Sequence, residues 1–412
     1  MKTIIMAGGK GTRIASVASD IPKPMIPVSG KPVLEHQLNV LKAQGIKEVT
    51  LITGHLGNVI REHFRDGSSF GISIDYVEEN EPLGTGGALS FFRDCKEDIL
   101  LVFGDILFDI DISSMYEAYL GDKAEVLLFT HPNSHPYDSV LIETDDEHRV
   151  RRLITKEDVR RDYVNRVNAG IHILSPSLLQ TLPEKPVKLD FDRDIMRAAI
   201  ERGKVYAYDS TEYVHDMGTP DRYGQVCRDL ESGLVAGRNR KKKQKAVFLD
   251  RDGTINKEIG FFSDPDKMEL VPEAAEAIRM FNSSEYLVIV VTNQSIIARG
   301  ECTVEGLKAV HRRMYRLLGE KGAYVDGLYY CPHHPDSGFE GEVKELKIEC
   351  ECRKPKPGML LQAAREHNID LNASWMIGDS ERDMKAGENA GCRTIFSPEG
   401  LTKEIAEQIL KS

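Results

Sequence analysis

Two short loops, at 8–13 and 250–254, carry residue types suited to chemistry at phosphate. The first reads GGKGTR, and its glycines let backbone N–H groups approach a triphosphate while Arg13 adds a fixed cation. The motif PKPM follows and adds Lys23 nearby. No Lys-Ser or Lys-Thr pair closes the first loop, so it is not a P-loop. The glycines that we expect beside the phosphates are Gly8, Gly9 and Gly11.

The second loop, DRDGT, places Asp250 and Asp252 two residues apart after an apolar run. This spacing suits a nucleophilic carboxylate with an acid or base beside it, and Mg²⁺ would screen their mutual repulsion. Three later motifs, VVTNQS, CRKPKPGM and IGDSERD, supply more polar residues, and the first and last of them end apolar runs. Those polar residues are Thr292, Asn293, Arg353, Lys354, Asp379 and Asp383.

Three further motifs of the N-terminal half could complete a nucleotide site. PLGTGGAL at 82–89 is a second glycine-rich turn, suited to a base or a ribose. Asp105 ends an apolar strand and Asp216 lies in HDMGTPDRY, and we expect both carboxylates to bind Mg²⁺. VNAG adds a polar loop. The remaining residues of these motifs that we expect at the site are Gly84, Thr85, Asn168 and Gly170.

Glu79, in the acidic run EENE ahead of PLGT, bears on the choice of base. Its carboxylate could accept hydrogen bonds from the N1–H and the exocyclic amine of guanine together, an edge with two donors that adenine and uracil lack. This favours GTP as the nucleotide. An ordinary surface carboxylate explains the residue equally well, so the sequence leaves the base open.

A C-x-H…C-x-C set in the C-terminal half consists of Cys331, His333, Cys350 and Cys352. Three thiolates and one imidazole match the ligands of a tetrahedral structural Zn²⁺, with no open position for catalysis. An incidental cluster of buried thiols is the alternative. Because Cys352 directly precedes the two cations of CRKP, the metal would also hold those cations in place.

Strand-like and helix-like segments alternate along the chain, the pattern of open α/β sheets. Closely spaced strands between 124 and 174 predict a mixed sheet in the N-terminal half, and the alternation restarts after 245. The other predicted strands cover 2–7, 48–53, 72–78, 99–105, 245–250, 286–293 and 375–380, and the predicted helices lie near 33–45, 190–202, 220–232, 272–281 and 303–318.

Between these two patterns lies AGRNRKKKQK, which has six basic residues and no apolar periodicity. A nucleic-acid patch could look like this, but its position favours a solvated linker between domains. We therefore predict a nucleotide-handling domain at 1–235, a linker at 236–245 and a second domain at 246–412.

Charge and hydropathy limit the partners. A net charge of −11 argues against binding to nucleic acid. No apolar run approaches the roughly 18 residues that a membrane-spanning helix needs, and the first residues lack the features of a secretory signal. We expect a cytoplasmic protein that acts on small molecules and does not bind membranes. A homo-oligomer is left open.

Taken in order, the N-terminal motifs resemble those of the sugar-nucleotide pyrophosphorylases over residues 1 to about 232. The resemblance implies a glycosyltransferase-A-like Rossmann domain that joins an NTP to a sugar 1-phosphate and releases pyrophosphate. It also implies that Thr12 helps to hold the triphosphate, that Lys23 neutralises the reacting phosphates and that Lys156 contacts the sugar phosphate. The segment ITKED around Lys156 lacks the usual Glu-Lys-Pro of that family, so an edge-strand lysine remains the alternative.

The C-terminal motifs resemble the haloacid-dehalogenase superfamily, without a large cap domain. The resemblance implies that Asp250 forms an aspartyl-phosphate, that Asp252 acts as acid and then base, and that Thr292 and Lys354 stabilise the phosphoryl group. It assigns Mg²⁺ to Asp250, the carbonyl of Asp252 and Asp379, with Asp383 further from the ion.

Within that superfamily, the metal loop and CRKP resemble heptose-1,7-bisphosphate phosphatases and, nearly as well, histidinol-phosphate phosphatases. In the heptose enzymes, Arg353 and the stretch beginning at Glu258 would recognise substrate. Together, the halves resemble a fusion that dephosphorylates D-glycero-D-manno-heptose 1,7-bisphosphate, expected as the α-anomer, and then forms GDP-heptose. A hexose-1-phosphate nucleotidyltransferase, such as one for mannose 1-phosphate, fused to another phosphatase remains the alternative.

Overall fold

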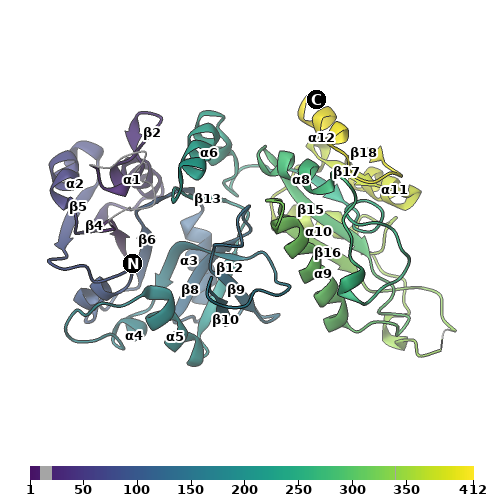
Figure 1. Cartoon of the computed structure of the whole chain (residues 1–412), viewed down its shortest axis with the longest axis horizontal. Coiled ribbons are helices and arrows are strands. Elements are labelled where there is room, and N and C mark those ends of the chain that lie inside the picture. The colour runs from purple at the N-terminus through teal and green to yellow at the C-terminus, as the bar shows by residue number, and fades with distance from the viewer. Residues whose placement is uncertain (10–20, 339) are drawn as a thin grey trace. The chain divides into compact units, whose positions relative to one another are not determined.

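The computed structural model describes residues 1–9, 21–338 and 340–412, and this part of the chain divides into two compact units (Figure 1). The N-terminal unit consists of Met1–His131, Ile142–Ile154 and Asn168–Asn239. The C-terminal unit consists of Arg240–Ser412 together with the short segments Pro132–Leu141 and Thr155–Val167.

In the described residues, the N-terminal unit is built on a nine-stranded sheet. Seven strands follow the order β10-β9-β11-β6-β1-β4-β5, while β8 pairs with β11 and β12. Strand β6 runs parallel to β1 and antiparallel to β11, which confirms the predicted mixed sheet. The strands are β1 (Lys2–Met6), β4 (Glu48–Thr53), β5 (Ser73–Glu78), β6 (Ile99–Phe103), β8 (Val126–His131), β9 (Leu141–Thr144), β10 (Val150–Ile154), β11 (Val167–Leu174) and β12 (Val205–Asp209).

Burial of apolar side chains explains this order. The central strand β1 buries Ile4 and Ile5 completely, and helix α1 buries Leu34, Leu38 and Leu41 in the same core as Ile5. The other helices of eight or more residues here are α2 (Gly57–Phe64), α3 (Ile112–Asp122) and α6 (Pro220–Glu231), while α1 covers Val33–Ala43. Short elements complete the unit: β2 (Pro27–Val28), β3 (Lys31–Pro32), β7 (Ile106–Asp109), β13 (Tyr213–Asp216), α4 (Pro176–Leu179), α5 (Arg197–Glu201) and α7 (Leu234–Gly237).

The predicted helix near 190–202 differs in its first part. Residues Phe191–Met196 form a π-helical turn, and only Arg197–Glu201 are α-helical. The Asp190 side chain caps the turn by accepting from the backbone N–H of Arg193, and the Thr85 hydroxyl accepts from the N–H of Phe191 at 2.8 Å. Because these partners lie outside the helix itself, apolar spacing could not indicate the wider turn.

The C-terminal unit has a parallel five-stranded sheet in the order β16-β15-β14-β17-β18. The order reverses between β14 and β17, and ligands bind at such a switch point in open α/β sheets. The strands are β14 (Lys245–Leu249), β15 (Tyr286–Asn293), β16 (Gly327–Cys331), β17 (Trp375–Gly378) and β18 (Arg393–Phe396).

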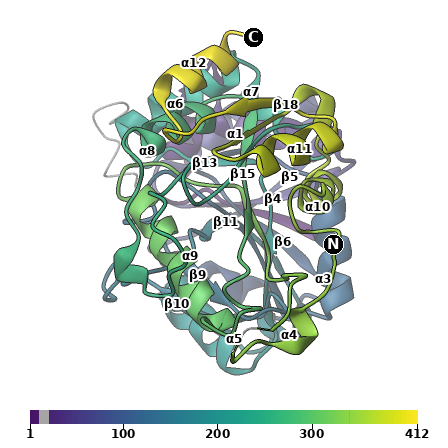
Figure 2. The same cartoon turned by 90° about the vertical axis from the view of Figure 1, so that its right-hand side faces the viewer.

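Helices cover both faces of this sheet, because alternate residues of each strand point to opposite faces. Val247 and Leu249 of β14 pack with α8, α9 and α12, whereas Ala246 and Phe248 pack with α10 and α11. Figure 2 shows α10 and α11 lying beside each other. The helices are α8 (Ala274–Asn282), α9 (Val304–Gly319), α10 (Gly358–Glu366), α11 (Glu381–Ala390) and α12 (Lys403–Leu410).

The basic segment at 236–245 is only partly solvated. Its lysines at 241–243 are exposed as expected, but Arg238 is buried at 5% exposure. Asn239 donates to Asp109 at 2.8 Å, which fixes the segment beside β7. The expectation of a fully solvated run was therefore wrong at Arg238, where packing that the composition does not reveal buries a guanidinium.

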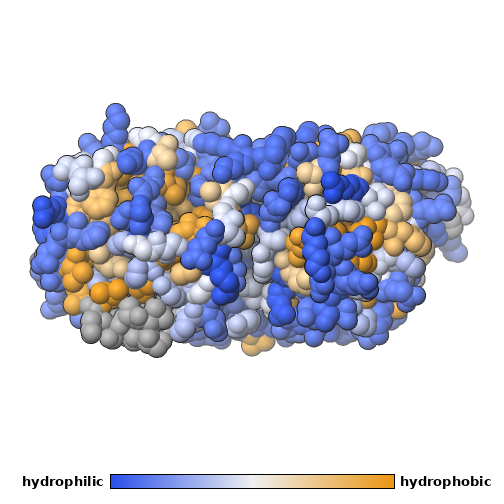
Figure 3. Space-filling model, turned by 90° about the horizontal axis from the view of Figure 1, so that it is seen from above, coloured by the Kyte–Doolittle hydropathy of each residue, from blue (hydrophilic) through white to orange (hydrophobic). Residues whose placement is uncertain are grey.

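Hydrophilic residues cover most of the face of the molecule that Figure 3 shows, and hydrophobic residues gather in a few patches. Within the described ranges, no helix combines the length and the apolarity needed to cross a bilayer.

Candidate active sites

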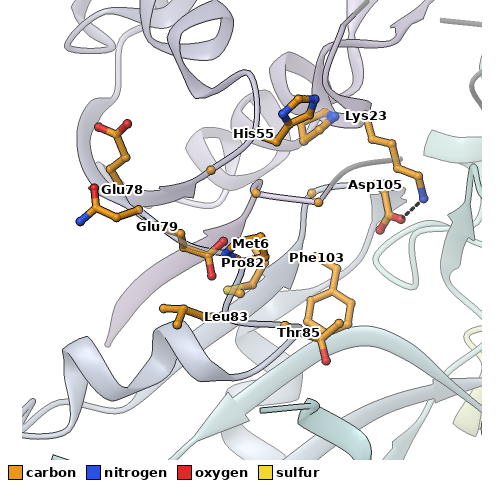
Figure 4. A pocket seen from close by; sticks show the side chains of 17 residues that line it. Met6, Lys23, His55, Glu78, Glu79, Pro82, Leu83, Thr85, Phe103 and Asp105 are labelled. Carbon is orange, nitrogen blue, oxygen red and sulfur yellow. Dashed lines mark hydrogen bonds and ion pairs between the residues drawn. The ribbon is translucent and has the colours of Figure 1, made fainter. Parts of the chain in front are cut away.

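A cavity of about 740 Å³ lies at the carboxyl ends of β1 and β6 in the N-terminal unit (Figure 4). Here β1 lies between β4 and β6, which is the switch point of the parallel strands. The structure brings together seven of the predicted site residues in the lining of this cavity. They are Gly8, Gly9, Lys23, Glu79, Gly84, Thr85 and Asp105.

Lys23 and Asp105 form an ion pair with 2.9 Å between Nζ and Oδ2. The Lys23 side chain is 12% exposed and that of Asp105 is 33% exposed, so the carboxylate still reaches solvent. Figure 4 shows the two side chains meeting at one end of the cavity. This places a cation and a carboxylate where phosphate oxygens and a divalent ion could bind.

Asp216 lies close to this pair through the backbone. Strand β13 pairs with β7, and the N–H of Met217 donates to the carbonyl of Asp105 at 3.1 Å. The Asp216 carboxylate accepts from Arg222 at 3.1 Å and from the N–H of Gly218 at 2.7 Å. Two carboxylates at neighbouring strand ends offer the hard oxygen ligands that Mg²⁺ prefers.

Glu79 points into the cavity towards Met6 and Pro82, whereas Glu78 points away (Figure 4). Burial raises the pKa of Glu79, and a hydrogen bond from the backbone of Leu83 opposes this rise. Its Oε1 atom is buried and has no hydrogen-bond partner among the described residues. A buried acceptor without a donor is costly, so this atom favours a ligand that donates hydrogen bonds.

The backbone around Glu79 also requires glycine. A Cβ added to Gly8 would lie 2.4 Å from Oε2 of Glu79, so only glycine lets the two approach. Gly84 has a φ of +78°, and a Cβ there would meet the carbonyl of Leu189 at 2.4 Å. The backbone at Gly84 thus requires glycine, whereas a larger residue at Gly8 would displace the Glu79 carboxylate.

Asn168 does not line this cavity but stands behind Phe103, which does. Its side chain donates to Asp192 at 2.9 Å and hydrogen bonds to His172 at 2.9 Å, and its Oδ1 accepts from the N–H of Gly170. Burial lowers the pKa of His172 to about 3, so the ring is neutral, and burial raises the pKa of Asp192 to about 6. Asn168 thus connects two buried titratable groups behind the cavity wall.

Asp216 and Gly170, like Asn168, do not line the cavity, and four more predicted residues are not placed there. Gly11, Thr12 and Arg13 lie outside the described residues. Lys156 is exposed at 75%, lies 4.0 Å from Glu157 and is not among the lining residues. Its contact with a sugar phosphate stays a prediction.

A second cavity, of about 400 Å³, lies at the carboxyl ends of β14, β15 and β17. The predicted residues that line it are Asp250, Asp252, Glu258, Thr292, Asn293, Arg353, Lys354, Asp379 and Asp383. Four motifs spread between residues 250 and 383 thus meet at one edge of the sheet.

Lys354 is the central cation of this cavity. Its ammonium lies 2.9 Å from Asp250 and 2.6 Å from Asp383, and its side chain is 2% exposed. Burial raises the pKa of Asp250, Lys354 opposes this rise, and the charges on Asp383 and Asp252 add to it. Burial alone would lower the pKa of Lys354, but the two carboxylates outweigh it and the pKa is raised.

Three carboxylates could hold a divalent ion here. Ligand oxygens of Asp250, Asp379 and Asp383 lie within 4.8 Å of one another. Asp383 also accepts from the N–H and hydroxyl of Ser380 at 3.1 and 2.6 Å, so its oxygens are engaged by Ser380 and Lys354. Asp250 and Asp379 are therefore the carboxylates best placed to bind the ion directly.

Asp252 is held by three side chains that sequence reasoning missed. The guanidinium of Arg251 donates to both of its oxygens at 2.8 Å, Asn256 donates at 3.0 Å and Gln294 at 2.8 Å. Gln294 also donates to the hydroxyl of Thr292 at 2.8 Å. The position of Gln294 directly after Asn293 in VVTNQS could have indicated that it lies at the site. Arg251, which stands between the two aspartates in DRDGT, gives no such indication in the sequence.

Asn293 fixes the backbone of Lys354. Its amide donates to the Lys354 carbonyl and accepts from the Lys354 N–H, both at 3.0 Å. Glu258 is exposed and accepts from the N–H of Gly260 at 2.7 Å. At this edge, Asn293 holds the backbone of Lys354, while Glu258 lies at the solvent side.

The four predicted zinc ligands cluster as the spacing suggested. The ligand atoms of Cys331, His333, Cys350 and Cys352 lie within 4.8 Å of one another. The sulfur–sulfur distances are 3.1–3.5 Å, and all seven cysteines of the chain are free thiols. Hydrogen bonds from the other thiols, Cys331 first, lower the pKa of Cys352 to about 5 despite its burial. Tetrahedral Zn–S bonds of about 2.3 Å separate ligand atoms by roughly 3.8 Å, so these three thiols and the imidazole could hold one ion after moving apart by a few tenths of an ångström.

Comparisons with known proteins agree with this division of the chain. The profile of the nucleotidyl transferase family matches residues 2–233, which is more than half of the chain. The chain belongs to the nucleotidyl transferase family. A HAD-hydrolase-like profile matches residues 351–410.

Individual relatives extend this result. A D-glycero-beta-D-manno-heptose-1,7-bisphosphate 7-phosphatase of Pasteurella multocida (strain Pm70) is 44% identical over 147 residues, covering 36% of this chain and 77% of the relative. A mannose-1-phosphate guanylyltransferase of Mycobacterium tuberculosis (strain ATCC 25618 / H37Rv) is 33% identical over 237 residues, covering 56% of this chain and 65% of the relative. The chain is therefore also a member of the family of this heptose-bisphosphate phosphatase. It is an enzyme with nucleotidyltransferase and phosphatase activity.

A solved structure supports the fold of the nucleotidyl transferase half. A putative glucose-1-phosphate thymidylyltransferase from Bacillus anthracis matches with a TM-score of 0.50 and 20% identity, covering 55% of this chain and 94% of that one. At this identity the match shows the fold alone.

Replacing Lys354 by methionine should destabilise the C-terminal unit by about 3–5 kcal/mol at pH 8, because two buried carboxylates lose their cation. Burial raises the pKa of Asp250 in the folded chain, so the stability contributed by this group is present at low pH and is lost as the pH rises through the folded pKa. The deficit should therefore shrink towards pH 5. Urea unfolding followed by the fluorescence of Trp375, the single tryptophan of the chain, measures this.

Lys356→Met is the matched control for Lys354→Met. Lys356 lies in the same loop and is 41% exposed, with Glu351 at 3.1 Å, so its loss should cost less than about 1 kcal/mol. Equal stability of Lys354→Met and the wild type at pH 8 would contradict the role given to Lys354.

Proposed function

We propose that this chain makes a GDP-activated heptose in two steps. In the first, the C-terminal unit removes the 7-phosphate of a heptose 1,7-bisphosphate. In the second, the N-terminal unit transfers GMP from GTP to the resulting heptose 1-phosphate and releases pyrophosphate. The observation that carries the proposal is that both cavities have a carboxylate–lysine pair at the switch point of a sheet, one in each unit.

The pairing of activities favours a heptose. The phosphatase relative acts, by its name, on heptose 1,7-bisphosphate, and the nucleotidyltransferase relative is a guanylyltransferase. Removing the 7-phosphate leaves a sugar 1-phosphate, which is the acceptor that a nucleotidyltransferase of this kind needs. Histidinol phosphate offers no such acceptor. That phosphatase is named for the β-anomer, and we expect the α-anomer here, so both anomers belong in the assay.

The phosphatase step starts at Asp250. Its carboxylate attacks phosphorus, the sugar oxygen leaves with a proton from Asp252, and water then attacks the aspartyl-phosphate as Asp252 takes a proton back. Lys354 and Thr292 would stabilise the charge on the transferring phosphoryl group. Asp250, Asp379 and the carbonyl of Asp252 would hold Mg²⁺, which supplies positive charge to the phosphoryl oxygens and the two carboxylates.

Nucleotidyl transfer needs no protein nucleophile. An oxygen of the sugar phosphate attacks the α-phosphorus, and the bond to pyrophosphate breaks. Lys23 and the backbone at Gly8 and Gly9 would stabilise the charge that develops on the phosphate oxygens. Asp105 and Asp216 would hold Mg²⁺, which screens the charge of the triphosphate, while Gly84 and Thr85 would face the base or ribose.

Asp250→Asn should abolish phosphate release from heptose 1,7-bisphosphate, because an amide cannot act as the nucleophile, and should leave GTP-dependent pyrophosphate release from heptose 1-phosphate intact. Asp105→Ala should abolish GTP-dependent pyrophosphate release and leave phosphate release from heptose 1,7-bisphosphate intact. Each activity is measured separately on purified protein with Mg²⁺. Equal loss of both activities in either variant would show that the sites are not independent.

Glu79→Gln should reduce the preference for GTP over ATP by about tenfold or more. The carboxylate can accept from both N1–H and the amine of guanine, whereas an amide replaces one acceptor by a donor. Titration calorimetry with GTP, ATP, UTP and CTP measures this preference. Glu78→Gln is the control, because Glu78 also lines the cavity but is 66% exposed, lies 3.8 Å from Arg61 and points away from Glu79 (Figure 4). Equal wild-type affinity for all four nucleotides would remove the argument for guanine.

The thiol cluster should hold about one zinc ion per chain, measured by elemental analysis. Cys352→Ser should lose the ion and lower the melting temperature reported by Trp375, because the ion ties three separated cysteines together. Cys302→Ser should keep the metal, since Cys302 lies outside the cluster. A protein purified without chelators that contains no zinc and melts as Cys352→Ser does would rule this site out.

A further inference from the structure

Gln37 is a polar residue on the apolar face of helix α1. Leu34, Leu38 and Leu41 of this helix pack in the core of the N-terminal unit, and Gln37 is completely buried among them. An apolar side chain would suit such a position, because burying an amide costs free energy unless the amide forms hydrogen bonds. The reason for a glutamine here therefore lies in the groups that its amide contacts.

The amide of Gln37 holds the turn that carries Asp105. Its Nε2 donates to the carbonyl of Phe103 at 2.9 Å and to the carbonyl of Ile106 at 2.7 Å. Phe103 is the last residue of β6 and Ile106 is the first of β7, so the two bonds span the break between these strands, where Gly104 and Asp105 lie. One planar amide thus fixes the backbone on both sides of a predicted Mg²⁺ ligand.

The other end of this amide is not satisfied. In the part of the chain that the structure describes, the Oε1 atom of Gln37 is buried and has no hydrogen-bond partner. A buried acceptor without a donor is costly, which reduces the net gain in stability from this side chain. The position that Gln37 gives to the turn explains the residue better than stability does.

The turn also passes close to the central strand β1. The N–H of Gly104 donates to the carbonyl of Met6 at 3.0 Å, and a Cβ added to Gly104 would lie 2.8 Å from that oxygen. Figure 4 shows the Asp105 side chain leaving this turn towards Lys23. The backbone at Asp105 is therefore held between β1 on one side and the amide of Gln37 on the other.

The contact with Ile106 extends the effect to the second predicted Mg²⁺ ligand. Strand β7 pairs with β13 so that Ile106 lies opposite Asp216. The N–H of Met217, directly after Asp216, donates to the carbonyl of Asp105 at 3.1 Å. Holding the first residue of β7 therefore fixes the backbone of both carboxylates relative to each other.

We propose that Gln37 is a positioning residue for nucleotidyl transfer, whose amide holds Asp105 and Asp216 at the spacing that a divalent ion and a triphosphate require. This rests on the proposed function of the N-terminal unit. Two carboxylates repel each other before an ion is bound, and a turn that is free to move would let them separate. Binding would then have to restore their spacing. Fixing the turn in advance avoids this cost and so raises the affinity for the ion together with its nucleotide.

Gln37→Met keeps the length of the side chain and removes both donors. With Mg²⁺ present, it should weaken the binding of GTP, or of whichever NTP the wild type prefers, by about tenfold or more, the usual cost of losing a group that orients a metal ligand. With EDTA in place of Mg²⁺, the nucleotide should bind both proteins equally. Titration calorimetry on the full chain measures these affinities. Gln37→His retains an N–H donor and should recover part of the Mg²⁺-dependent affinity.

Hydrogen exchange of the metal-free protein gives a readout that needs no bound ion. Peptides covering 99–109 and 213–218 should lose protection in Gln37→Met, because the turn and the β7–β13 pairing are no longer held. Strand β4 should stay protected, which would show that the N-terminal unit is folded. Should β4 lose protection in Gln37→Met, Gln37→His is compared with the wild type in the same way.

Gln44→Met is the matched control. Gln44 directly follows α1, and its amide also binds backbone, donating to the carbonyl of Ile110 and accepting from the N–H of Ile112 at 2.9 Å. These contacts lie beyond the other end of β7, at the start of α3. Gln44→Met should therefore leave the Mg²⁺-dependent affinity unchanged.

An unchanged Mg²⁺-dependent affinity in Gln37→Met, or an equal loss in Gln44→Met, would overturn the positioning role. A loss that persists in EDTA would overturn it too, because it would indicate a general disturbance of the cavity, and so would a wild type that gains no affinity from Mg²⁺. A wild type whose Mg²⁺-dependent binding needs Gln37, but which releases no pyrophosphate with heptose 1-phosphate, would keep the positioning role and reject the proposed acceptor.

Discussion

Carboxylates at the ends of parallel strands must be balanced by a cation before a sheet edge can become a phosphate site. In the C-terminal unit this cation is Lys354, whose ammonium contacts both Asp250 and Asp383. Its backbone is held by Asn293 at the end of β15, so one lysine connects β14, β15 and the start of α11. Without the positive charge of Lys354, nothing would offset the burial of the Asp250 and Asp383 carboxylates. The other contacts of the cavity therefore depend on this lysine.

The N-terminal unit also pairs a lysine with a carboxylate, and this pair is more exposed to solvent. Lys23 and Asp105 are 12% and 33% exposed, against 2% and 15% for Lys354 and Asp250. The difference fits the chemistry of each site. A carboxylate that attacks phosphorus needs a dry, fixed position, whereas one that only holds an ion beside a triphosphate can stay hydrated. The burial of Asp250 is thus what the proposed nucleophile requires, and the greater exposure of Asp105 suits the proposed ion ligand.

Strands and their polar ends were predictable because a run such as YLVIVVTN is apolar until its last two residues, and parallel strands bring those ends to one edge. The mixed sheet and the thiol cluster followed from strand spacing and ligand spacing. The partners of Asp252 were not predictable, because Arg251 and Gln294 reach it only through the turn after β14 and the end of β15. Arg382, which lies in the first turn of α11 and lines the second cavity, was missed for a related reason: sequence alone suggests that a charged residue on a helix faces solvent.

The thiol cluster is connected through the backbone to both Asn293 and Lys354. Cys331 ends β16 opposite Asn293 of β15, and the N–H of Gln294 donates to the Cys331 carbonyl at 2.7 Å. Cys352, at the other end of the cluster, directly precedes Arg353 and Lys354. The long segment between the two cysteines therefore leaves and returns at the edge of the cavity. Tying its ends together fixes Lys354 between the cluster on one side and Asn293 on the other. A metal held by these four side chains would act on the position of the Lys354 ammonium, and through it on the charge balance of Asp250, without taking part in the proposed chemistry.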